Sequence, residues 1–71
     1  MARRYWYLDD RDVWCFCPPG QNDAGTVLQV SVRKWHASMY RTTSKGVNQS
    51  KFFRSLKTAQ LWVEVIWELE R

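Results

Sequence analysis

The sequence is poor in the residues that build most chemical sites. It has two cysteines, two prolines, three glycines and one histidine in 71 residues. Gly20, Gly25 and Gly46 are isolated from one another, so the chain has no glycine-rich phosphate loop. The single histidine, His36, has no identifiable carboxylate partner for acid–base catalysis. We therefore expect a protein that is not an enzyme and that uses no cofactor and no small-molecule substrate.

The two cysteines, Cys15 and Cys17, are separated by one residue. On an extended strand they share one face at roughly 6.6 Å, and with no turn between them this is poor disulfide geometry. Cys15, Cys17 and His36 could bind zinc together with an aspartate, but structural zinc sites usually combine two separate ligand pairs. Two reduced cysteines that pack as small apolar side chains are favoured over a metal site.

Long apolar runs are also absent. Polar and charged residues follow Met1, so no signal peptide is indicated, and no segment approaches the ~18 apolar residues of a membrane span. We expect a cytoplasmic protein without a membrane partner.

Acidic residues are missing from one long stretch. The formal net charge is +4, and the segment from Arg33 to Lys57 carries seven Lys or Arg and no Asp or Glu. Such asymmetry bears on partners and not on fold. It favours a polyanion such as DNA, although a solvated polar surface gives the same pattern.

Aromatic residues are abundant, and the chain divides into short elements. Residues 4–8 and 13–17 flank an aspartate-rich turn and predict an N-terminal hairpin over about 4–17. Pro18-Pro19-Gly20 opens a loop over 18–26. Strands are expected over about 27–54, followed by a helix over about 56–70. The predicted class is α+β: one domain over 1–71, with a small antiparallel β-sheet of three to five strands packed on one C-terminal α-helix.

The apolar alternation changes phase near Arg33. Leu28, Val30 and Val32 share one side of a strand, whereas Trp35 begins a series in the other phase. A bulge, a bend or a turn is required at Arg33–Lys34. We expect a long bent strand there, because Arg-Lys is weak turn chemistry.

The predicted helix has more apolar positions than one face can hold. Ser55 is a suitable N-cap. One stripe follows the 3.6-residue period: Leu56, Ala59, Trp62, Val63, Ile66 and Leu69. Leu61, Val65 and Trp67 fall outside it, and they are the candidate protein interface.

One face of the sheet is a candidate nucleic-acid surface. If Trp35, Ala37 and Met39 face the helix, the residues that alternate with them face outward and can approach a DNA major groove. Together with the basic turns, the candidate nucleic-acid-binding residues are Arg33, Lys34, His36, Ser38, Tyr40, Arg41, Lys45, Lys51 and Arg54.

The segments KWHASMYR and KFFRSLKTAQLW, over about residues 33–63, carry a resemblance. Phe53, Ser55, Ala59 and Trp62, with Lys34, Trp35 and Ala37 before them, are similar to the AP2-like DNA-binding domains of plant transcription factors and phage-type tyrosine integrases. The resemblance implies a three-stranded sheet with one C-terminal helix, DNA as the partner, and a phage, prophage or bacterial type of protein.

A second function stays open. A small inhibitor or interaction protein of the phage-encoded type would bind a host protein, or form a homodimer, through exposed aromatic and apolar residues. The sequence also leaves open whether residues 1–17 cover the outer face of the sheet. If they do, the DNA-binding hypothesis fails on geometry.

Overall fold

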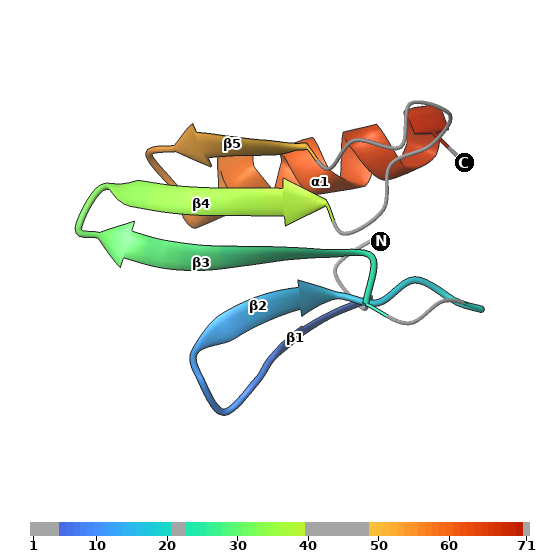
Figure 1. Cartoon of the computed structure of the whole chain (residues 1–71), viewed down its shortest axis with the longest axis horizontal. Coiled ribbons are helices and arrows are strands. Elements are labelled where there is room, and N and C mark those ends of the chain that lie inside the picture. Colours follow the sequence, from blue (N-terminus) through green and yellow to red (C-terminus); the bar gives the residue numbers. More distant parts are fainter. Residues whose placement is uncertain (1–4, 21–22, 40–48, 71) are drawn as a thin grey trace.

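A five-stranded antiparallel sheet carries one helix on one of its faces (Figure 1). The computed structural model describes residues 5–20, 23–39 and 49–70. The elements are β1 (Trp6–Leu8), β2 (Val13–Phe16), β3 (Gly25–Ser31), β4 (Lys34–Met39), β5 (Ser50–Phe53) and α1 (Leu56–Glu70). The strands lie side by side in chain order. The predicted α+β class with a C-terminal helix is confirmed.

The turn of the N-terminal hairpin is built around the side chain of Asp9. Asp9 Oδ1 accepts hydrogen bonds from the backbone N–H groups of Arg11 at 2.8 Å and Val13 at 3.0 Å. Asp9 Oδ2 accepts a bond from Arg11 Nη2 at 2.7 Å. The bond from Val13, followed by that from the Arg11 side chain, lowers the pKa of Asp9 to about 2. Asp12 completes the turn with a φ of 61°, a conformation that Asp tolerates better than most residues.

The hairpin extends the sheet sideways and does not fold over it. β1 pairs with β2, and β2 pairs with β3 through Val13–Leu28, Trp14–Val27, Cys15–Thr26 and Phe16–Gly25. Figure 1 shows both strands beside β3 in the same layer. The question that the sequence left open is answered in part for the described part of residues 1–17. Neither strand of the hairpin crosses the face opposite α1, although Cys15 and Thr26 are buried on that face.

β3 begins at Gly25, inside the segment 18–26 that we predicted as a loop. A Cβ atom at Gly25 would lie 2.9 Å from the Ser38 carbonyl oxygen and 3.0 Å from Val63 Cγ1. The first distance is shorter than a methyl group tolerates, and the second would require the Val63 side chain to shift by a few tenths of an ångström. Glycine therefore permits the close approach of β3 to its neighbour strand and to α1.

The prediction of one bent strand through Arg33–Lys34 is wrong, because the chain reverses at Val32–Arg33. Gln29 pairs with Trp35 and Ser31 with Lys34, so the register shifts by a bulge between Gln29 and Ser31. Among the described residues only Asp12 and Gly20 have a positive φ, so this turn is not of the glycine-rich hairpin type. The bulge adds the local twist that such a turn lacks.

α1 begins where the sequence predicts. Ser55 Oγ accepts a hydrogen bond from the Thr58 backbone N–H at 3.3 Å, which satisfies one free amide of the first turn. Ala59 and Val63 are fully buried against the sheet, as are Val27 and Ala37 on its side. Trp6 Nε1 donates to Glu64 Oε2 at 2.7 Å and ties β1 to the helix.

Two helix positions differ from the predicted stripe. Leu69 was assigned to the core stripe but is 74% exposed, because it lies at the border of that stripe, in line with Leu61 and Val65. Trp67 was assigned outside the stripe, yet its ring packs edge-on against Phe16 with centroids 6.2 Å apart. The sheet is wide enough for β2 to reach Trp67, which a prediction based on the helix alone does not foresee.

Within the described ranges, α1 falls short of the length and apolar character that a bilayer-spanning helix requires.

Candidate nucleic-acid interface

We call the side of the sheet opposite α1 the outer face. Residues directly opposite each other on paired strands project to the same face. Ala37 and Met39 are buried beneath α1, so the residues that alternate with them lie on the outer face. The register places two rows of side chains there: Val13, Leu28, His36 and Phe52, and Tyr7, Cys15, Thr26, Ser38 and Ser50.

The first row contains a pair of neighbouring rings. The centroids of His36 and Phe52 are 4.8 Å apart, with 41° between the ring planes. Phe52 is 53% exposed although it is apolar, and Leu28 beside His36 is 36% exposed. The Lys34 ammonium group lies 4.5 Å from the centroid of the Phe52 ring. The outer face is therefore aromatic and partly apolar, with a cation at its border.

Three cationic residues gather at one corner of the sheet, and we call Arg33, Lys34 and Arg54 the basic corner. Arg33 lies in the β3–β4 turn and Lys34 begins β4. Phe53 pairs with Trp35 in antiparallel register, so the next residue of that chain segment, Arg54, lies beside Lys34. All three side chains are exposed. The basic corner adjoins Phe52 and so borders the ring pair directly.

The remaining predicted nucleic-acid residues are not brought together on this face. Lys51 pairs with Ala37, and its ammonium group lies 5.7 Å from the Phe53 centroid, so Lys51 lies on the α1 side of edge strand β5. Ser38 lies on the outer face in the second row. Tyr40, Arg41 and Lys45 lie outside the described residues.

The far end of the second row is polar and acidic. The Tyr7 hydroxyl donates to Asp23 Oδ1 at 2.9 Å, and this bond is the main reason why the pKa of Tyr7 is raised above its usual value. Cys15, in the same row, is 2% exposed, and burial raises the pKa of its thiol. This cluster lies on β1 and β2, on the opposite side of β3 from the basic corner.

The alternative zinc site receives no support from the described ranges. No group of three or more His, Cys, Asp or Glu side chains is placed there to hold a metal ion, and Cys15 and Cys17 are not joined in a disulfide.

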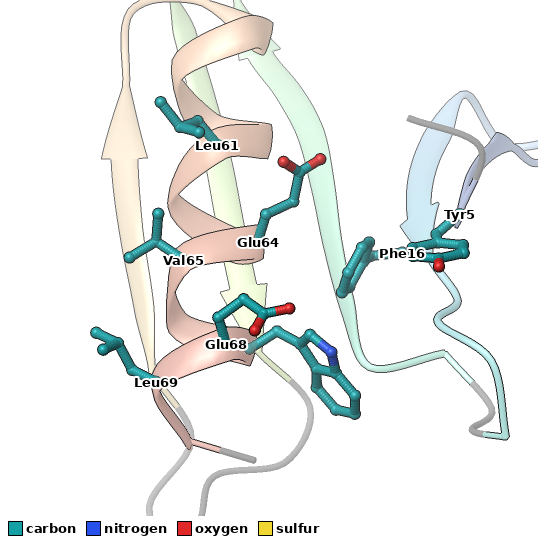
Figure 2. A pocket seen from close by; sticks show the side chains of 8 residues that line it. Tyr5, Phe16, Leu61, Glu64, Val65, Glu68 and Leu69 are labelled. Atoms are coloured by element: carbon teal, nitrogen blue, oxygen red, sulfur yellow. The ribbon is translucent and has the colours of Figure 1, made fainter. Parts of the chain in front are cut away.

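The predicted protein interface is divided by the structure. Leu61 and Val65 are 57% and 46% exposed, whereas Trp67 is half-buried against Phe16. Figure 2 shows Leu61, Val65 and Leu69 along one side of α1, turned away from Phe16 and Tyr5. We call Leu61, Val65 and Leu69 the helix row. It borders a hollow of about 340 Å³ between α1 and the N-terminal hairpin.

Sequence reasoning missed Phe52 and Leu28 as residues of the outer face. A signal for Phe52 was available. Phe52 and Phe53 are adjacent on a strand, so one of the two rings must face away from the helix. Leu28 could be placed on the outer face only from the strand register. The bulge near Val30 breaks the alternation between β3 and β4, so the sequence pattern does not show that Leu28 and His36 share a face.

The chain matches no protein-family model, no curated protein and no solved structure. Its function is therefore argued from its own residues.

Proposed function

We propose that this protein is a small nucleic-acid-binding module that contacts DNA with the outer face of its sheet. The observation that carries the proposal is the basic corner. It borders the exposed ring of Phe52, which packs beside the half-buried ring of His36, on a face that the strands of the N-terminal hairpin do not cross. Cations position a nucleic-acid backbone, and the adjoining face meets its bases.

The distribution of charge on this face supports the proposal. Arg33, Lys34 and Arg54 can each meet a phosphate. Asp9 is paired with Arg11, and Asp23 accepts a hydrogen bond from Tyr7. Asp9 lies in the turn between β1 and β2, and Asp23 lies in the loop before β3, so neither belongs to the strands β4 and β5 beside the basic corner.

The AP2-like resemblance implies a three-stranded sheet before a C-terminal helix, whereas this sheet has five strands, of which β3, β4 and β5 directly precede α1. A fold hosts many functions, so this partial agreement adds to the proposal without carrying it. The phage, prophage or bacterial type of protein belongs to the same proposal.

A matched pair of charge reversals tests the outer face. Lys34→Glu and Lys51→Glu change the net charge equally, and both lysines are exposed strand residues, but they lie on opposite faces. Binding to labelled DNA is measured by fluorescence anisotropy at several salt concentrations. We expect Lys34→Glu to weaken binding about tenfold at low salt and to reduce the log–log salt slope by about 1. Lys51→Glu should change the affinity by less than about threefold.

Two results would contradict the proposal. Equal losses in both variants would mean that net charge, and not the outer face, drives binding. No binding of the unmodified chain at low salt would exclude a nucleic-acid function for this basic protein.

A second candidate function, self-association, is favoured by the helix row. These three residues recur every fourth position and form a ridge that a second helix can pack against. We propose that the helix that packs against this ridge is α1 of a second copy of this chain, in antiparallel orientation. Lys57 lies in the first turn of α1, and the last turn holds Glu68 and no basic residue, which opposes the helix dipole. An antiparallel copy places each basic end beside the other copy's acidic end.

A further inference from the structure

We infer that the outer face binds single-stranded DNA, with a base stacked on Phe52 beside His36, and not the groove of a duplex. This inference rests on the proposed nucleic-acid function and specifies its substrate.

The chemistry of the first row separates the two substrates. Groove readout requires hydrogen-bond donors and acceptors aimed at base edges. The first row of the outer face consists of Val13, Leu28, His36 and Phe52, of which only His36 can form such bonds. The hydroxyl groups of the second row lie one step away from the exposed ring, and Thr26 among them is buried. If a duplex docked here, Leu28 and Phe52 would cover polar base edges, and those edges would find no hydrogen-bond partner on either side chain. An unpaired base presents its apolar ring face instead, which matches this row.

The geometry of the ring pair suits stacking. Phe52 lies on edge strand β5 and is 53% exposed, so a base can reach its ring from the face and from the edge of the sheet. His36 lies opposite Phe52 on β4, with 4.8 Å between centroids and 41° between the ring planes, so it supports the Phe52 ring from one side as part of one aromatic cluster. Aromatic rings on sheet faces are a common platform for unpaired bases.

Lys34 connects the stacking surface to the phosphates. Its ammonium group lies over the Phe52 ring at 4.5 Å from the centroid, and the side chain is exposed. A stacking base would take the place of this ammonium group over the ring. The released group would then meet the phosphate of the same strand, beside Arg33 and Arg54.

The test compares two probes of equal length, a labelled oligo-dT of about 15 nucleotides and a labelled duplex. Binding is measured for the unmodified chain, for Phe52→Ala and for Phe52→Tyr, which keeps a ring. Leu8→Ala is the control, because Leu8 is 49% exposed and lies on β1, at the opposite edge of the sheet from Phe52. Circular dichroism establishes that each variant retains the fold.

We expect the unmodified chain to bind oligo-dT at least about tenfold more tightly than the duplex. Phe52→Ala should lose roughly 5- to 150-fold in affinity for oligo-dT, the range for one stacked base, while the salt slope stays unchanged. Phe52→Tyr should remain within about threefold of the unmodified chain, and Leu8→Ala should not differ from it.

The outcomes separate this inference from the proposed function. If neither probe binds at low salt, the proposed function fails. If the duplex binds as tightly as oligo-dT, or if Phe52→Ala leaves oligo-dT binding unchanged or weakens both probes equally, the protein is still a nucleic-acid-binding module but the single-strand inference is overturned.

Discussion

Replacing Gly25 with alanine tests the closest approach between the sheet and the helix. The new methyl group would meet the Ser38 carbonyl oxygen at 2.9 Å, Val63 Cγ1 at 3.0 Å and Met39 Sδ at 3.2 Å. The carbonyl belongs to a strand that is hydrogen-bonded on both sides, so it cannot move away easily. Overpacking of this kind typically costs about 1–3 kcal/mol.

Part of this cost is offset, because alanine restricts the unfolded chain more than glycine does. That effect stabilises by about 0.4–1 kcal/mol, so the mid-range values of the two effects leave a loss of about 1 kcal/mol in the free energy of unfolding for Gly25→Ala. A chain of 71 residues has a total stability of about 4–10 kcal/mol. Urea unfolding followed by tryptophan fluorescence, with a slope of about 1 kcal/mol per M, should show a midpoint lower by about 1 M.

A double-mutant cycle identifies the source of the loss. In a Val63→Ala background the Cγ1 contact is gone, so Gly25→Ala should cost less there than in the unmodified chain. Gly20→Ala is the control for backbone strain alone, since Gly20 has a φ of 77° and no atom within 4 Å of an added Cβ. Strictly additive losses, or a Gly25→Ala variant as stable as the unmodified chain, would refute the close approach.

Two further predictions concern the hairpin turn and the helix row. The pKa of Asp9 is lowered to about 2, so its carboxylate stabilises the fold above about pH 4, and this contribution is lost as the pH falls towards 2. Asp9→Asn keeps a hydrogen-bond acceptor but does not titrate, so the urea midpoint of this variant should depend less on pH over that range than the midpoint of the unmodified chain. Parallel pH profiles for the two proteins would contradict this. Val65→Glu should abolish self-association of the chain in sedimentation experiments at several hundred micromolar, and an unmodified chain that is monomeric there would refute the antiparallel pair.

Local signals in the sequence predicted the helix and the N-terminal hairpin well. The Ser55 cap and the 3.6-residue period placed α1, because both act within one or two turns of the chain. The aspartates between two aromatic segments predicted the hairpin for a similarly local reason, since Asp9 bonds backbone groups two and four residues further on.

Features that depend on contacts distant in sequence were not predictable in the same way. The β3–β4 turn has no glycine or asparagine signal, because a bulge two residues earlier supplies its twist. Gly25 is a strand residue only because β4 and Val63 approach it from elsewhere in the chain. Phe52 belongs to the candidate site because of its pairing with His36, which depends on the register of two strands joined by a long connection.

The position of the helix row along one side of α1 has a consequence for any pair formed through it. The row is turned away from Phe16 and Tyr5, and it does not lie directly opposite the sheet. A two-fold axis between two antiparallel helices that pack along such a side leaves both sheets on the same side of the helix pair. The two outer faces would then be inclined to each other and would not point in opposite directions, so one longer strand of nucleic acid could run from one copy to the other.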